Sequence, residues 1–121
     1  TNYARKSVGC ERTFLEDLSL PSAILIELYH LVVELTERLE KSKFVGKTVT
    51  LKIKFNDFQQ ITRSITTHKR LRTKNDILPL AKQLLQQIHY SNIHPIRLMG
   101  LTIKFGDRRW QHQIGMGAIR I

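Results

Sequence analysis

The chain has 121 residues, of which 41% are hydrophobic and 25% are charged. This length and balance predict one soluble globular domain with a single core, and no apolar run approaches the roughly 20 residues that a membrane span requires. The single cysteine, Cys10, excludes an internal disulfide and a thiolate metal site, and is typical of a reducing, intracellular setting.

Positive charge is concentrated in the second part of the chain. The formal net charge is +10; residues 1–40 hold 4 Lys and Arg against 7 Asp and Glu, whereas residues 41–121 hold 16 against 3. An excess this large favours a polyanionic partner, which we expect the second part to bind. The alternative is that the charge only keeps the protein soluble. Because the sequence begins without Met, we expect a fragment of something longer.

The first predicted elements are a strand and a long helix. Residues 6–14 alternate, with Val8, Cys10, Arg12 and Phe14 on one side, which predicts a strand. Ser19 and Pro21 are typical of a helix start. The apolar residues after them recur at steps of three and four up to Lys41, as in an amphipathic helix: Ile24, Leu28, Leu31, Val32, Leu35 and Leu39. Its outer side is acidic, so we do not expect this helix to face a polyanion.

The next two predicted strands form a hairpin. Residues 47–55 alternate between apolar and polar positions, and the polar face carries Thr48, Thr50, Lys52 and Lys54. Asn56 and Asp57 tolerate the positive φ angles of a tight turn. The strand that follows, to Arg70, is expected to point Ile61 and Ile65 inward and the following residues outward: Gln60, Thr62, Ser64 and Thr66.

A second helix and a last strand follow. Thr73 and Asp76 have the spacing of a capping box, and the apolar stripe continues to Ile88. Pro79 leaves two alternatives: either Asp76 is the true cap and Pro79 lies in the first turn, or the helix bends there. Residues 96–105 predict a strand with Met99, Leu101, Ile103 and Phe105 inward and with the alternate positions outward: Leu98, Gly100, Thr102 and Lys104.

The element order is βαββαβ, which predicts an α+β fold with a four-stranded, mostly antiparallel sheet and two helices packed on one face. The other sheet face is left open, and it is polar and cationic with almost no aromatic side chains. The ordinary interpretation of such a face is a solvated surface rich in Thr. Its clustering across three strands favours a binding surface instead.

Catalytic and metal-binding chemistry find little support in the sequence. The five histidines show no paired ligand spacing, neither phosphate-binding glycine motif (GxxxxGK[ST] or GxGxxG) occurs, and Cys10 is expected in the core. We therefore expect no catalytic residue, cofactor or metal in this chain. Hydroxyls, cationic side chains and backbone N–H groups bind phosphate, which predicts salt-sensitive binding without sequence preference.

The same βαββαβ order occurs in RNA-recognition domains, which stack bases on aromatic residues of the sheet. Their third strand reads [KR]G[FY][GA]FVx[FY], whereas this one reads FQQITRSITTHK, without an aromatic residue at the stacking positions. Contact with the backbone of a duplex is therefore favoured over RNA binding.

Four segments together resemble a known family: KSVGCERTF (6–14), DFQQITRS (57–64), Thr73-x-x-Asp76 before Leu84-Leu85, and PIRLMGL (95–101). Their order and spacing are similar to the little-finger (polymerase-associated) domain of Y-family translesion DNA polymerases of the DNA polymerase IV (DinB) type. The resemblance covers most of the chain. It implies a single domain over 1–121, with residues 1–5 ending an interdomain tether.

The resemblance also implies how such a domain works. Its open sheet face lies in the major groove of the primer-template duplex and contacts the phosphate backbone, with backbone amides contributing at Gly9 and in the hairpin turn. Strict alternation points Arg63 toward the helices, so its contact with DNA requires a twist or bulge. The family motifs and the polar face together predict these DNA-binding residues: Arg5, Lys6, Ser7, Gly9, Lys52, Lys54, Asn56, Thr62, Arg63, Ser64, Thr66, Thr102 and Lys104.

Further expectations concern the rest of the polymerase. The palm, which binds magnesium in this family, is absent, so this chain alone is not expected to polymerise DNA. The implied setting is the bacterial cytoplasm at the nucleoid, and the implied partners are the catalytic core and the sliding clamp, with the fragment itself monomeric. Residues 108–121 are expected to be a C-terminal tail or an extra strand, and Gln113, Ile114 and Met116 are expected to be either a degenerate clamp-binding peptide or part of that strand. A module that docks a polymerase onto the clamp is the alternative function.

Overall fold

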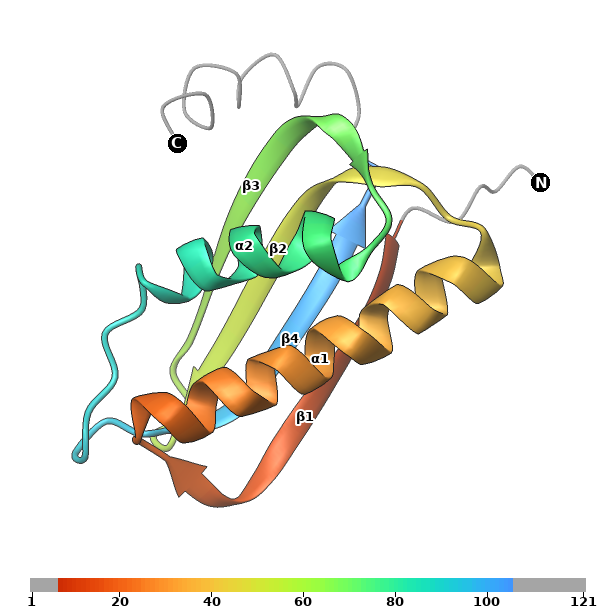
Figure 1. The fold of residues 1–121 in the computed structure, drawn as a ribbon. Coiled ribbons are helices and arrows are strands. Elements are labelled where there is room, and N and C mark those ends of the chain that lie inside the picture. The colour runs from red at the N-terminus through yellow and green to blue at the C-terminus, as the bar shows by residue number, and fades with distance from the viewer. Residues whose placement is uncertain (1–6, 106–121) are drawn as a thin grey trace.

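The computed structural model describes residues 7–105, and its elements follow the predicted order βαββαβ (Figure 1). The elements are β1 (Ser7–Leu18), α1 (Pro21–Ser42), β2 (Gly46–Phe55), β3 (Gln60–Leu71), α2 (Lys74–Leu85) and β4 (Ile96–Lys104). The α+β fold class is confirmed. Neither helix of the described part is long and apolar enough to cross a membrane.

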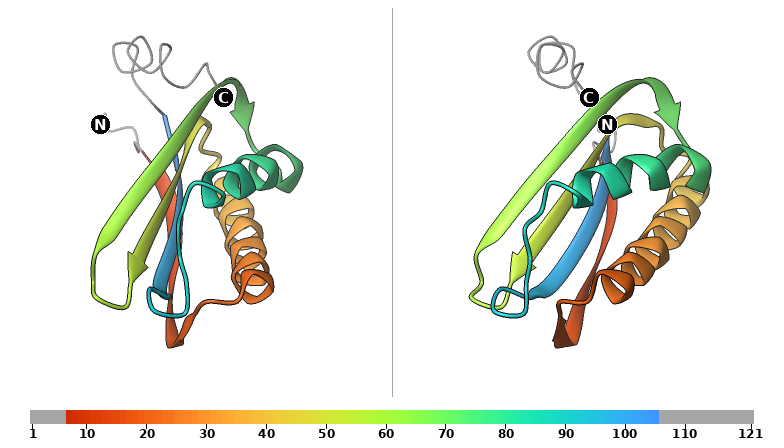
Figure 2. Two further views of the ribbon diagram at one scale, coloured as in Figure 1. Left: turned by 90° about the vertical axis from the view of Figure 1, so that its left-hand side faces the viewer. Right: turned by 60° about the vertical axis from the view of Figure 1, so that its left-hand side comes forward.

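The four strands form one sheet in the order β1-β4-β2-β3, so the last strand lies between the first and the second. All three strand pairs are antiparallel. Both helices lie on the same face of the sheet, and no described element covers the other face (Figure 2). The predicted two-layer arrangement with one open sheet face is therefore confirmed.

The core lies between the two central strands and the helices. Alternation along β2 and β4 turns every second side chain toward the helices. The residues at these positions are completely buried: Val49, Leu51, Ile53, Met99, Leu101 and Ile103. α1 packs against β1 and β4, and α2 packs against β2 and β3. The apolar stripe of α1 contributes Leu28, Leu31 and Leu35, which are also completely buried. Each such side chain contributes about 1.5–3 kcal/mol through burial, so the core fixes which sheet face stays open.

Two predicted strand ends differ in the structure. β1 continues four residues beyond Phe14, to Leu18, after an irregularity in its pairing with β4 between Thr13 and Leu18. Phe105 was predicted to point inward, but it lies beyond the end of β4 and is 64% exposed. Its prediction was wrong because the pairing of β4 with its neighbours stops at Lys104, so alternation no longer determines where the next side chain points.

The start of α1 is only partly as predicted. Pro21 is the first helical residue. Proline is tolerated at this position because the N–H group of a first helical residue has no partner within the helix. Ser19 is not the cap, because Leu20 holds that position and makes no side-chain cap bond. Instead, the Ser19 hydroxyl donates to Asn92 Oδ1 at 2.9 Å. This bond ties the start of α1 to the loop before β4.

The predicted capping box of α2 is confirmed. Thr73 Oγ1 accepts a hydrogen bond from the N–H of Asp76 at 3.3 Å, and the Asp76 carboxylate accepts one from the N–H of Thr73 at 3.1 Å. Thr73 is therefore the cap, and the alternative with Asp76 as the cap was wrong. Pro79 lies within the helix, which continues to Leu85.

Asp76 is expected to make the stability of the domain depend on pH. Backbone N–H groups of Arg72 and Thr73, together with the Lys69 ammonium at 3.2 Å, lower the pKa of Asp76 to about 2. A lowered folded-state pKa stabilises the fold above about pH 4, and this contribution is lost as the pH falls toward 2. Between about pH 5 and pH 2, Asp76→Asn should therefore lose less unfolding free energy than the wild type.

Urea unfolding at stepped pH measures this difference. Glu37→Gln removes a carboxylate from the exposed side of α1 and serves as the control, which should follow the wild type. Parallel loss of stability in the wild type and in Asp76→Asn would show that the cap carries no pH dependence.

Candidate nucleic-acid interface

The strand register arranges the open face as four rows of four residues. Residues paired directly across neighbouring antiparallel strands point to the same face. The rows, each read from β1 through β4 and β2 to β3, are Ser7-Lys104-Thr48-Thr66, Gly9-Thr102-Thr50-Ser64, Glu11-Gly100-Lys52-Thr62 and Thr13-Leu98-Lys54-Gln60. No aromatic residue occupies any of these positions, so the face offers no stacking platform for bases.

Nine of the predicted DNA-binding residues belong to these rows. They contribute three ammonium groups, five hydroxyls and one glycine: Lys52, Lys54, Lys104, Ser7, Thr62, Ser64, Thr66, Thr102 and Gly9. The sequence prediction missed Glu11, which is the single acid among the row positions. Alternation along β1 already placed Glu11 on the side of Ser7 and Gly9, so the signal was present in the sequence.

Arg63 lies on the opposite side of the sheet. Its register partner is Leu51, a completely buried residue that faces the helices. Because β3 is an edge strand, Arg63 is nevertheless exposed, and its Nη1 donates to the carbonyl of the adjacent Thr62 at 2.8 Å. The structure therefore follows strict alternation here, and Arg63 stands at the rim of the sheet outside the four rows.

Hydroxyls of β2 and β3 pair across the open face. Thr48 Oγ1 lies 2.8 Å from Thr66 Oγ1, and Thr50 Oγ1 lies 2.7 Å from Ser64 Oγ. Each pair holds two hydroxyl protons and uses one of them internally, which leaves one proton to donate elsewhere. Thr48 and Thr50 are buried whereas Ser64 is exposed, so the outer members on β3 are the ones placed to meet a partner.

Gly9 allows β1 to lie close against β4. A Cβ atom at this position would stand 2.6 Å from Thr102 Oγ1 and 2.9 Å from the carbonyl oxygen of Leu101. On the helix side, Arg38 Nη1 donates to the Gly9 carbonyl at 2.9 Å. The backbone at Gly9 is thus fixed from the helix layer while its open side carries no side chain.

The hairpin turn between β2 and β3 contains Asn56 and Asp57, as predicted, but its backbone conformation differs from the prediction. The positive φ angle occurs at Phe58 (68°) rather than at Asn56 or Asp57. The N–H groups of Asn56, Phe58 and Gln59 all donate within the protein, to Pro95 O, Phe55 O and Asp57 Oδ1. Those three turn amides are therefore not free for phosphate, and Asn56 offers its side chain instead.

Residues from the loop before β4 hold this turn in place. His94 stacks on Phe55 with the ring centroids 3.8 Å apart, and its Nε2 lies 3.6 Å from the Asp57 carboxylate. The Arg97 guanidinium lies 4.9 Å from the centre of the Phe58 ring. The turn is consequently positioned by contacts to the β4 side of the molecule.

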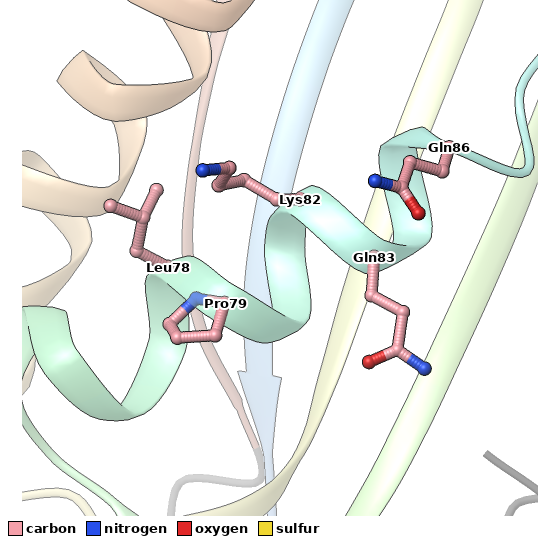
Figure 3. Close-up of a pocket in the computed structure, with 5 residues that line it drawn as sticks. All are labelled: Leu78, Pro79, Lys82, Gln83 and Gln86. Atoms are coloured by element: carbon pink, nitrogen blue, oxygen red, sulfur yellow. The ribbon is translucent and has the colours of Figure 1, made fainter.

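Three further features of the described residues lie outside the four rows. No group of three His, Cys, Asp or Glu residues within 7–105 is placed to hold a metal ion. Burial raises the pKa of Cys10 to about 11, and its thiol lies 3.5 Å from the Leu31 carbonyl, so it is a protonated core residue. The hollow on α2 in Figure 3 is lined by Leu78, Pro79, Lys82, Gln83 and Gln86, which include no acid that could act with Lys82.

Five predicted site residues lie outside the described part: Arg5, Lys6, Gln113, Ile114 and Met116.

Known proteins resemble this chain in sequence. Residues 5–115 match the family described as the impB/mucB/samB family C-terminal domain. DNA polymerase IV of Bacteroides fragilis is 54% identical over 99 residues, covering 82% of this chain and 27% of that protein. DNA polymerase IV of Akkermansia muciniphila is 44% identical over 99 residues with the same coverage. The chain therefore spans about a quarter of the length of these curated relatives.

Solved structures resemble it as well. A complex of the beta-clamp processivity factor and the little finger domain of PolIV matches with a TM-score of 0.67 at 30% identity, covering 84% of this chain and 89% of that one. A Y-family DNA polymerase chimera of Dbh and Dpo4 matches with a TM-score of 0.71 at 17% identity, over 86% of this chain and 29% of that one, which shows a shared fold. The chain belongs to the impB/mucB/samB C-terminal domain family and is a little-finger domain of the Y-family DNA polymerase IV type, as its motifs predicted.

Proposed function

We propose that this domain grips the primer-template duplex of a translesion DNA polymerase through phosphate contacts from its open sheet face. The observation that carries the proposal is the register of the four rows, which gathers three lysines and a set of hydroxyls on one aromatic-free surface. In this proposal DNA synthesis is carried out by a longer polymerase of which the domain is one part, in keeping with its coverage of 27% of DNA polymerase IV of Bacteroides fragilis. In this proposal residues 1–5 end the tether to the catalytic core, and the protein works at the bacterial nucleoid.

Phosphate contacts explain why such a face suits a damaged template. Lysine ammonium groups and hydroxyls donate to phosphate oxygens, which are the same at every base. Lys54 and Lys104 supply charge at the two end rows, and Thr62, Ser64 and Thr102 supply neutral donors between them. A duplex bound in this way is held without reading its bases, so a lesion does not prevent the grip.

The residues beside the rows have supporting roles in the proposal. Asn56 extends the surface at the turn, and Arg63 reaches a phosphate only where the backbone passes the rim at β3. Arg5 and Lys6 precede the start of β1 in sequence and add positive charge next to Ser7. These contacts lengthen the surface beyond the four rows.

Binding assays on the 121-residue chain test this function. Anisotropy titrations should give equal affinities for two duplexes of unrelated sequence and weaker binding to single-stranded RNA. With six to ten phosphate contacts, duplex affinity should fall on the order of a thousandfold between about 50 and 200 mM salt. Salt-independent binding, or a preference for the RNA, would count against the proposal.

Docking onto the sliding clamp is a second candidate function. It is favoured by the likeness to a PolIV little finger that was solved in complex with the beta clamp. The tail residues Gln113, Ile114 and Met116 are the proposed contact. Deleting residues 113–121 should then abolish clamp binding measured by surface plasmon resonance, and unchanged binding would exclude the tail as the contact.

A further inference from the structure

An ion pair crosses the middle of the open face. Lys52 Nζ on β2 lies 2.8 Å from Glu11 Oε1 on β1, although β4 runs between these two strands. Both side chains are partly exposed, with 34% of the Lys52 side chain and 50% of the Glu11 side chain accessible. The pair therefore lies on the surface that faces the proposed duplex.

Gly100 provides the gap that the pair spans. It is the register partner of both Glu11 and Lys52, so it sits between them in the third row. A Cβ atom on Gly100 would stand 3.1 Å from Glu11 Cβ and 3.6 Å from Glu11 Oε1. Because glycine has no side chain, Glu11 and Lys52 can meet above the β4 backbone.

The pair removes one positive charge from the centre of the surface. The neighbouring cations of the helix side have other partners, since Arg12 pairs with Glu27 and Arg38 with Glu34. Lys52 is thus the only cation paired with Glu11 within residues 7–105. Exposed ion pairs contribute little to the free energy of unfolding. The Glu11–Lys52 pair therefore affects the charge of the surface more than the stability of the domain.

We propose that Glu11 limits the affinity of the domain for duplex DNA by holding Lys52 away from the phosphates. This inference rests on the proposed duplex-binding function and assigns a residue that limits affinity to the same surface. In the third row, the Glu11 carboxylate accepts the hydrogen bond that the Lys52 ammonium would otherwise donate to a phosphate oxygen. The strong cationic contacts are then left to the two end rows, with Lys104 in one and Lys54 in the other.

Glu11→Gln tests the proposal. Freeing Lys52 for one more phosphate contact should raise duplex affinity about fivefold at about 100 mM salt and steepen the salt slope by about 0.9. Glu37→Gln changes the net charge by the same amount on the exposed side of α1, on the other layer of the molecule. It should change affinity less than about twofold, because charges farther apart than the Debye length are screened.

The double variant Glu11→Gln with Lys52→Met separates a freed lysine from a general loss of negative charge. Its affinity and salt slope should return to the wild-type values, because the extra contact is gone. Thermal unfolding of each variant checks that the fold is kept. Three results would overturn the role of Glu11 without affecting the proposed duplex binding. They are a gain in duplex affinity that persists in the double variant, an equal gain in Glu37→Gln, and no gain in Glu11→Gln. Absence of salt-dependent duplex binding in the wild type would instead overturn the proposed function, and this inference with it.

Discussion

Replacing Lys54 and Lys104 together by alanine is expected to lower the affinity for duplex DNA by roughly thirtyfold at about 150 mM salt. The two ammonium groups occupy opposite end rows of the open face, and neither takes part in an ion pair within the described residues. Losing two phosphate contacts should also flatten the plot of log affinity against log salt by about 1.8. Anisotropy titrations at several salt concentrations measure both quantities.

The matched control is the pair Lys41→Ala and Lys82→Ala. It removes the same net charge from exposed positions on α1 and α2, in the layer on the other side of the sheet. The control should leave the salt slope unchanged and lower affinity by less than about threefold through the weaker long-range field. An equal loss in both double variants would mean that net charge, rather than the open face, determines binding.

Leu51→Ala is expected to cost about 3 kcal/mol of unfolding free energy. Leu51 lies at the centre of the sheet, completely buried, and is paired with Leu101 on the neighbouring central strand. Shortening it leaves a cavity within the buried core between the sheet and the helices. Urea denaturation followed by circular dichroism measures the change.

The next residue in the chain supplies the contrast. Lys52 points to the open face, so Lys52→Ala should change the free energy of unfolding by less than about 1 kcal/mol. Comparable losses in the two variants would contradict the assignment of neighbouring residues to opposite faces of β2.

Local patterns were sufficient to predict the elements and their faces. The period-2 alternation in residues 47–55 identified which side of β2 is buried, because only one register hides Val49, Leu51 and Ile53 from water. The spacing of Thr73 and Asp76 identified the start of α2, because a capping box depends on residues three positions apart. The open face and most of its polar residues followed from these short-range rules.

Contacts between distant segments could not be predicted in this way. The placement of β4 between β1 and β2 depends on how the crossovers pack, and the Glu11–Lys52 pair exists only because of that placement. The turn residues Asn56 and Asp57 were predicted correctly, but the residue with the positive φ angle was not. His94 and Pro95 contact the turn from another part of the chain. Phe58 then takes the positive φ angle that the sequence had suggested for Asn56 or Asp57.

The central claim is that the duplex lies on the open sheet face, and threonine methyl groups report on it directly. Thr62 and Thr102 lie in the rows of that face, whereas Thr36 lies on α1 and Thr73 caps α2. In an NMR titration of the methyl-labelled domain with duplex DNA, the Thr62 and Thr102 signals should shift while those of Thr36 and Thr73 stay in place. Shifts confined to Thr36 and Thr73, or spread equally over all four, would contradict the account.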